Sequence, residues 1–226
     1  MTFKKFVFAF AAATMVAGAA QAQSSTAFSL DLGSTGIGAY LSHRVASNVS
    51  ARVGLHYLKG SFDDTVNAVD YEVTLKLLNV DLLADWYPIA DSSFHLTGGA
   101  IYDGNEAHYR NKPVSNGVFT INGSQYSAAQ FGVLNGGAEF RKLAPYVGIG
   151  WGDALAGAPG WHFTSDIGAF YQGRGNVTLA STGCVGNAVV CQALARDVAA
   201  ERSRLEADNA TPRFFPVLRA GVSYRF

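Results

Sequence analysis

The sequence carries little charge, and neither sign accumulates anywhere along it. Charged residues make up 15% of the chain, the formal net charge is zero, and lysine and arginine form no basic run. Proteins that bind nucleic acid carry a basic patch or stripe, so we expect no nucleic acid among the partners. After residue 22 there is also no run of 18 or more apolar residues. The mature chain is therefore expected to have no membrane-spanning helix, which needs about 20 such residues.

Cysteine is nearly absent as well. The chain has two, Cys184 and Cys191, and no histidine lies near them. This excludes the usual cysteine and histidine ligand sets of zinc sites, so we expect no metal and no cofactor. The predicted signal-peptide cleavage site, before Gln23, has no cysteine, which argues against a lipid anchor.

The first segment has the pattern of a signal peptide. Lys4 and Lys5 precede an apolar run over residues 6–20, and Ala20-Gln21-Ala22 is a small-x-small cleavage site. We therefore predict a signal peptide over residues 1–22 and one exported domain over residues 23–226. In an exported chain the two close cysteines are expected to form a disulfide, which would stabilise the fold by about 2.5 kcal/mol.

The last thirteen residues alternate strictly between apolar and polar or small side chains. One face of residues 214–226 ends in Tyr224 and Phe226, and the other face carries Arg219 and Arg225. A period of two predicts a β-strand with one apolar face. The ending resembles the final strand of bacterial outer-membrane β-barrels, where the terminal phenylalanine is part of the insertion signal. The alternative is an edge strand of a soluble β-sandwich.

The same alternation recurs along the chain and predicts eight strands. They are expected near residues 28–32, 37–42, 49–57, 71–87, 94–103, 144–152, 161–172 and 214–226. The connections alternate between short turns (residues 45–48, 88–92 and 154–160) and long loops (residues 60–70, 110–133 and 183–213). Outer-membrane barrels have short periplasmic turns and long outer loops. We therefore predict an all-β fold: an eight-stranded antiparallel transmembrane β-barrel with long outer loops, one of which carries a short helix.

Several local features are expected within this frame. A phase slip near Leu77-Leu78 suggests a β-bulge, and the Asn-Gly pairs of the loop at 110–133 predict a small projecting hairpin. Residues 190–208 predict a helix of weak amphipathicity. Trp86 and Tyr87 are expected in an aromatic girdle, and the glycine column 148, 150 and 152 is expected to leave room for bulky side chains inside the barrel.

The alternation also places charged side chains in the lumen. The inward set is Asp31, Arg52, Asp81, Asp85, His95, Asp103, Asp166, Arg219 and Arg225. Buried charges must pair or meet water, which predicts a carboxylate–arginine network. This network is expected either to fill and rigidify a closed barrel with a structural or adhesive role, or to line the narrow path of a porin or uptake channel for small solutes. The excess of carboxylates would make such a path favour cationic, amino-acid-like solutes.

Four stretches carry a resemblance to a known family. They are residues 33–38 (GSTGIG), 79–88 (NVDLLADWYP), 144–150 (APYVGIG) and 168–173 (GAFYQG), and a Glu-rich segment also precedes the last strand. In this order they resemble the ornithine-uptake and carbapenem-associated (CarO-like) outer-membrane β-barrel family of Gram-negative bacteria. The resemblance implies an eight-stranded monomeric barrel. Transport of ornithine or carbapenems belongs to particular members, and no residue set here carries it over.

An enzyme is the competing functional class, because small outer-membrane barrels can modify lipid A. His108, beside Glu106, lies near the outer rim, and His162 lies next to a predicted periplasmic turn. His162 is thus at the wrong end for chemistry in the outer leaflet, and no serine lies at a persuasive spacing from His108, so we expect no enzymatic activity. The expected location is the bacterial outer membrane. The expected partners are outer-membrane lipid and lipopolysaccharide, the barrel-assembly machinery and small solutes.

Overall fold

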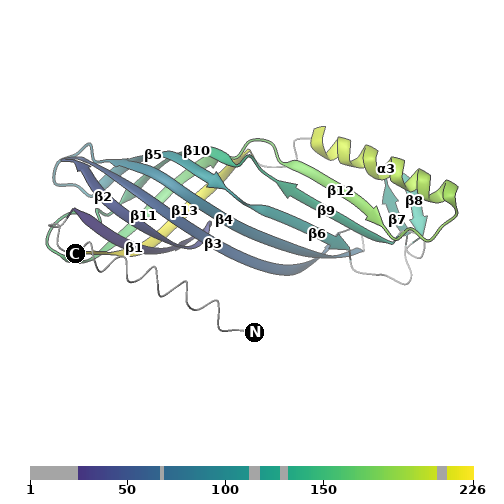
Figure 1. Cartoon of the computed structure of the whole chain (residues 1–226), viewed down its shortest axis with the longest axis horizontal. Coiled ribbons are helices and arrows are strands. Elements are labelled where there is room, and N and C mark those ends of the chain that lie inside the picture. Colours follow the sequence, from purple (N-terminus) through teal and green to yellow (C-terminus); the bar gives the residue numbers. More distant parts are fainter. Residues whose placement is uncertain (1–24, 67–68, 112–117, 128–131, 208–212) are drawn as a thin grey trace.

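Eight strands of the computed structural model close into an antiparallel ring (Figure 1). The structure describes residues 25–66, 69–111, 118–127, 132–207 and 213–226, so the predicted signal peptide lies outside the described residues. The ring strands are β1 (Thr26–Gly33), β2 (Gly36–Ala46), β3 (Val49–Val66), β4 (Val69–Trp86), β5 (Phe94–Asp103), β10 (Leu143–Trp151), β11 (Gly160–Tyr171) and β13 (Phe214–Arg225). β13 pairs with β1, with Phe28 opposite Tyr224, and this pairing leaves the barrel wall without an edge. The eight predicted strands and the closed barrel are confirmed.

Large apolar side chains cover the outer wall of the ring. Leu82, Val147 and Trp161 are 66%, 70% and 71% exposed, and each occupies an outward position of its strand. Aromatic residues flank this apolar wall at both ends. At the end with the short turns they are Trp86, Phe94, Trp151, Trp161 and Tyr224, and at the other end they are Tyr57, Tyr102, Tyr171 and Phe214. Trp86 thus lies where the girdle was predicted, whereas Tyr87 is buried against the ring of His95.

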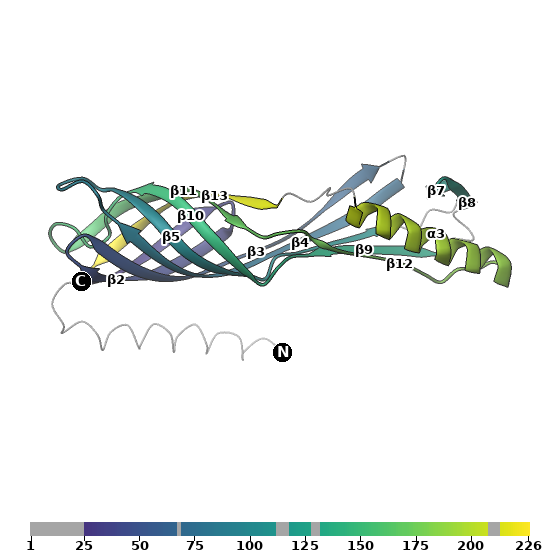
Figure 2. The ribbon, with the colours of Figure 1, turned by 90° about the horizontal axis from the view of Figure 1, so that it is seen from above.

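A second part of the sheet projects beyond the ring (Figures 1 and 2). The strands β6 (Glu106–Asn111), β9 (Val133–Glu139) and β12 (Asn176–Thr182) join the far halves of β4 and β3 in the order β12-β9-β6-β4-β3. Along the chain, β6 continues β5, β9 leads into β10, and β12 continues β11. The prediction of a polar loop over residues 60–70 is wrong, because β3 and β4 stay paired as far as Val66 opposite Val69.

The predicted β-bulge near Leu77-Leu78 is also wrong. The register between β3 and β4 is unbroken from Val49 opposite Trp86 to the far end of the hairpin. What changes is the side on which the apolar residues lie. In the ring, apolar Val80 and Leu82 point outward, whereas in the projection the same side of β4 carries polar Thr74 and Lys76. The outward side therefore changes from apolar on the ring to polar on the projection, as expected where a wall leaves lipid and enters water.

A hairpin and a helix pack on the projection. The hairpin strands are β7 (Val118–Ile121) and β8 (Ser124–Ser127), and the helix is α3 (Ala188–Ala207), within two residues of the predicted bounds. Asn122 and Gly123 have φ angles of 49° and 80°, the left-handed pair that a two-residue type I′ turn requires. The hairpin predicted from the Asn-Gly pair is confirmed. Buried side chains of the hairpin and of α3 form one apolar cluster with side chains of the sheet: Ile121, Tyr126, Leu194 and Val198 with Leu134 and Leu179. No helix in the described ranges is long and apolar enough to span a membrane.

Asp197 links α3 to the hairpin, and its titration is the first testable prediction. Its carboxylate accepts hydrogen bonds from the hydroxyl of Tyr126 at 2.5 Å and the amide of Asn122 at 3.2 Å. These bonds, that of Tyr126 foremost, lower the pKa of Asp197. Because the pKa of Asp197 is lower in the folded state, its contacts contribute their full stability at a pH above the unfolded-state pKa of about 3.9. This contribution is lost as the pH falls through the folded-state pKa. Carboxyl ¹³C NMR should therefore give a midpoint below about 3.9. Tyr126→Phe should raise this midpoint, and an unchanged midpoint would contradict the assignment.

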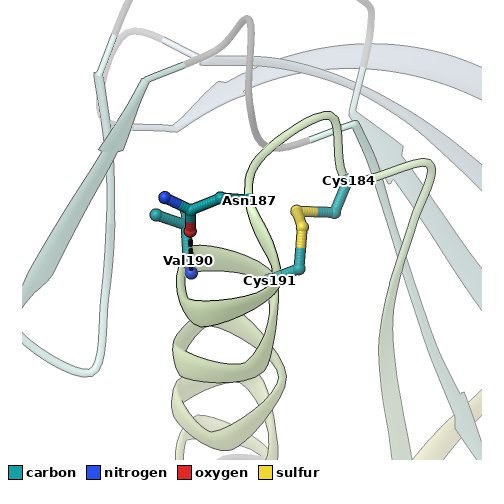
Figure 3. Close-up of a disulfide and its surroundings, with 4 residues drawn as sticks. All are labelled: Cys184, Asn187, Val190 and Cys191. Atoms are coloured by element: carbon teal, nitrogen blue, oxygen red, sulfur yellow. Dashed lines mark hydrogen bonds between the residues drawn. A yellow bond between two sulfur atoms is a disulfide. The ribbon is translucent and has the colours of Figure 1, made fainter.

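The disulfide between Cys184 and Cys191 fixes the start of α3 (Figure 3). Asn187 caps the helix in the same loop, since its side-chain oxygen accepts a hydrogen bond from the backbone nitrogen of Val190 at 2.9 Å. Replacing both cysteines by serine should destabilise the projection by about 2.5 kcal/mol. The measurement is the helical circular-dichroism signal during urea unfolding. The barrel should keep its own transition, because the disulfide lies outside the ring, and an equal loss in both transitions would show that this separation is wrong.

Candidate functional site: the charged lumen

Glycines on the same strand or on neighbouring strands create the space in which the large inward side chains lie. A Cβ atom added to any of these glycines would come within 2.6 Å of a ring atom or hydroxyl of the neighbouring side chain, closer than real Cβ atoms approach. The pairs are Gly38 with His56, Gly54 with Tyr40, Gly150 with His95, and Gly148 and Gly168 with Tyr146. The prediction that the glycine column makes room for bulky side chains is confirmed at positions 148 and 150. At Gly152 the near atom is the backbone oxygen of Phe163.

The first group of buried charges surrounds Arg52, and we call it the Arg52 cluster. The guanidinium donates to both carboxylate oxygens of Asp166, at 2.6 and 2.9 Å, and its Nε lies 3.1 Å from Asp85. Thr97 bridges the cluster, because its hydroxyl accepts from Arg52 at 3.3 Å and donates to Asp85 at 2.7 Å. His95 lies 3.4 Å from Asp166. These residues come from β3, β4, β5 and β11, so the cluster crosses the lumen from one wall to the other.

The second group, the Arg219 cluster, surrounds Asp81. The carboxylate of Asp81 accepts a hydrogen bond from the hydroxyl of Tyr40 and lies 2.9 Å from a guanidinium nitrogen of Arg219. The same guanidinium donates to the hydroxyl of Tyr40 and, through Nε, to Thr35 at 3.0 Å. His56 lies between two carboxylates, at 2.9 Å from Asp31 and 3.5 Å from Asp81. The ring of Tyr40 also contacts both arginines, whose guanidinium carbons lie 4.9 and 5.6 Å from its centre.

Apolar side chains close the lumen on either side of these clusters. Towards the projection they are Leu83, Ile101, Ala144, Tyr146, Phe170 and Val217, all buried, with the ring of Phe215 stacked on Phe170 at 4.9 Å. At the opposite end the turn between β10 and β11 folds inward, and Ala154 and Leu155 pack against Ala27. A chamber lined by residues of both clusters has about 20 Å³ of room for water-sized molecules. That is space for about one water molecule.

The structure brings most of the predicted lumen residues together. Asp31, Arg52, Asp81, Asp85, His95, Asp166 and Arg219 all belong to the two clusters. Asp103 is buried apart from them and accepts a hydrogen bond from the backbone nitrogen of Asn105 at 2.9 Å. Arg225 is a correction: it is the last residue of β13, and its guanidinium donates to the backbone oxygen of Gly157 in the turn at the end of the barrel. It therefore lies at the rim and outside both clusters.

Two members of the Arg219 cluster, Tyr40 and His56, were missing from the predicted network. His56 shares the inward face of β3 with Arg52, so the alternation did contain a signal for it. Tyr40 also lies on the inward face of its strand, but the predicted network included only charged residues, and Tyr40 is uncharged. The histidines considered for catalysis lie elsewhere. His108 is an exposed residue of the projection, 3.7 Å from Glu106, and His162 faces the backbone oxygen of Ala158 in the turn. The described residues include no group of three or more His, Cys, Asp or Glu arranged to hold a metal ion.

The fold of this chain is found in solved structures. The chain is similar to the crystal structure of Acinetobacter baumannii CarO2, with a TM-score of 0.61, 21% identity, and coverage of 89% of this chain and 98% of that one. It is also similar to the crystal structure of Acinetobacter baumannii CarO, with a TM-score of 0.58, 24% identity, and coverage of 91% and 99%. No family model matches the chain, and no curated protein matches it. At this identity the likeness establishes the fold.

Proposed function

We propose that the protein is an integral outer-membrane β-barrel protein whose lumen is closed and which holds the projecting sheet at the cell surface. Three features support the membrane location. The outer wall of the ring is apolar, aromatic residues flank it at both ends, and the outward side of β4 becomes polar where the projection begins. These are the features of a barrel that crosses a bilayer and continues into water. Export would remove residues 1–22.

The filled lumen carries the second half of the proposal. An eight-stranded barrel is just wide enough for its own side chains or one small ligand. Here two charge clusters and an apolar layer occupy it, and the chamber between them has room for about one water molecule. A solute such as an amino acid would have to displace both clusters. The ring therefore acts as an anchor, and the sheet, hairpin and helix outside it form the surface that meets the environment.

The alternative is a narrow uptake path for small cationic solutes. The observation in its favour is the excess of lumen carboxylates over guanidinium groups, namely Asp31, Asp81, Asp85 and Asp166 against Arg52 and Arg219. This path would require the two clusters to separate, because residues from both line the chamber. The same residues would then form its walls.

Conductance decides between the two functions. Purified protein, refolded and shown to be folded by its heat-modifiable gel migration, would be added to planar bilayers in potassium chloride. A parallel uptake assay in liposomes would use lysine and arginine as basic solutes and glutamate as the acidic control. The closed barrel predicts baseline conductance and no uptake. Steady channels with faster uptake of the basic amino acids would overturn the proposal and establish the path.

The remaining roles are proposals of the same kind. Phe226 and Tyr224 are exposed at the end of the last strand, with ring centres 5.5 Å apart, and they offer an aromatic end for the barrel-assembly machinery. Outer-membrane lipid and lipopolysaccharide would surround the apolar wall, with the barrel as a monomer. We also propose that the protein is not an enzyme, and lipid A from a deletion strain should keep its mass spectrum.

A further inference from the structure

Exposed basic residues lie together at the rim of the barrel where the ring meets the projection. They occupy the short segments between ring strands and projection: Arg141 and Lys142 between β9 and β10, Arg174 between β11 and β12, and Arg213 just before β13. The connections 140–142 and 172–175 contain no aspartate or glutamate. This part of the rim is therefore positively charged, although the net charge of the chain is zero.

The backbone of Gln172, a buried residue, holds three of these segments side by side. Its nitrogen donates to the carbonyl oxygen of Arg213 at 2.9 Å, and its carbonyl oxygen accepts from the backbone nitrogen of Arg141 at 3.3 Å. Hydrogen-bonded residues of an antiparallel ladder lie about 5.5 Å apart. Arg174 follows Gln172 by two residues, a span of at most about 7 Å. Because the arginine side chain is long, all three guanidinium groups can reach one anion.

The aromatic girdle sets the height of these arginines relative to the membrane. Arg213 directly precedes Phe214, and Arg174 follows Tyr171 by three residues. Tyr171 and Phe214 lie opposite each other on β11 and β13, with ring centres 5.2 Å apart. Phe214 and the nearby Leu143 are 61% and 64% exposed on the outer wall. Aromatic girdles mark the interface between membrane and water, so the arginines lie at the level of the lipid headgroups.

Charges on the neighbouring strands have partners within the protein. Lys76 of β4 lies 3.3 Å from Glu106. Glu139, the nearest carboxylate in the sequence to Arg141, belongs to β9 and lies opposite Glu106 of β6. No carboxylate of the described residues forms an ion pair with Arg141 or Arg174. An anion from outside the protein would therefore complete the charge balance of this part of the rim.

Phosphate is the anion that fits arginine best, because the guanidinium group is permanently charged and binds it through two parallel hydrogen bonds. The lipid A part of lipopolysaccharide carries phosphate groups on its sugars, directly above its acyl chains. We infer that Arg141, Arg174 and Arg213 bind a phosphate group of lipid A, whose acyl chains then lie against Leu143 and Phe214. The inference rests on the outer-membrane location proposed above, and it names the lipid and the place where it binds.

The test measures binding of lipid A to the folded barrel. The protein would be refolded into detergent micelles, checked by its heat-modifiable gel migration and titrated with diphosphoryl lipid A, with native mass spectrometry to count the bound lipid. Wild-type protein is expected to hold one lipid A molecule, and lipid A without its phosphates should bind at least about ten times more weakly. Inorganic phosphate at the same concentration should not displace the lipid. Displacement would mean that the site serves free anions, and the inference would be wrong.

Variants locate the site. Arg141→Gln and Arg174→Gln should each weaken the binding of lipid A about five- to tenfold. Lys76→Gln is the matched control: it removes one positive charge from the same rim, but one that Glu106 already balances, and it should keep nearly the full affinity.

Equal losses in all three variants would show a general attraction to the rim and would overturn the assigned site. A folded wild-type barrel that holds no lipid A would overturn the inference as well. Steady channels in the conductance experiment would contradict the closed lumen and leave this inference standing, so the two proposals can fail separately.

Discussion

Gly54→Ala should prevent the barrel from closing around its charged core. Gly54 lies directly opposite Tyr40 on β2, and a Cβ atom there would lie 2.3 Å from the ring of Tyr40. The ring cannot move aside freely, because its hydroxyl bonds to Asp81 and Arg219 and its face contacts Arg52. Overpacking of this kind costs about 1–3 kcal/mol, and the loss of hydrogen bonds to charged groups costs about 1.5–3 kcal/mol more. The combined loss is a large part of the stability of an ordinary domain.

The measurement is the urea concentration at which half of the protein loses the gel band of the folded barrel. The amount of folded protein recovered from membranes is measured as well. Gly98→Ala provides the control, because it makes the same chemical change in a ring strand, where an added Cβ would meet no described atom within 4 Å. It should fold with wild-type stability. If both variants lose the same stability, the effect comes from glycine flexibility in strands, and the close contact with Tyr40 is not its cause.

The barrel could be predicted from the sequence because its wall separates two very different surroundings. Along β3, Val53 and Leu55 face outward, and Arg52 and His56 face inward. Nearly every residue of the strand therefore follows the alternation of apolar and polar side chains. The strands of the projection carry a weaker pattern. β6 and β12 are short, and β12 is separated from β11 by a break of a few residues. Segments of this kind look like polar loops, because their stability comes from neighbouring strands that are distant in the sequence.

The phase slip in β4 shows how a correct observation led to a wrong structure. The apolar residues do change parity near Leu78, and a bulge is the usual local explanation. The strand itself stays in register with β3, and the side chain of Asn105 bonds to the backbone nitrogen of Leu78 at the point where the neighbouring strand changes from β5 to β6. The change lies in the surroundings of the strand. No local pattern distinguishes the two cases, because both invert the same alternation.

Only part of the candidate site could be predicted, because alternation is a local pattern. Alternation says which side chains point into the lumen, but not which of them lie at the same height. Arg52 meets Asp166 because the strand stagger of the closed ring brings β3 and β11 together across the lumen, a distance of 114 residues along the chain. Arg225 has the right parity, but it lies at the end of β13 and reaches the turn instead.

Arg52→Met should destabilise the barrel by about 3–5 kcal/mol, the usual cost of removing one partner from a buried ion pair. Arg52 is 8% exposed and compensates two carboxylates at once, Asp85 and Asp166. Methionine fills a similar volume but leaves both carboxylates buried without their counter-charge. The stability of Arg52→Lys should fall between that of the wild type and that of Arg52→Met. Lysine keeps the positive charge, but its ammonium group cannot reproduce the two-pronged contact with Asp166. The measured quantity is the free energy of unfolding in urea, with the gel shift as the signal that reports the folded fraction.

The triple variant Arg52→Met, Asp85→Asn, Asp166→Asn distinguishes charge from packing. It keeps the shape of the cluster and removes all three charges, so it should recover most of the lost stability. Arg202→Met is the surface control: its guanidinium pairs with Glu206 at 3.1 Å on α3, where both side chains are exposed, and it should change stability by less than about 0.5 kcal/mol. If Arg52→Met alone unfolds with a free energy within about 1 kcal/mol of the wild-type value, the loss is on the order of that for a surface ion pair. Water would then reach Asp85 and Asp166. In that case the lumen would be open enough to hydrate its charges, and the closed barrel would be the wrong description of the molecule.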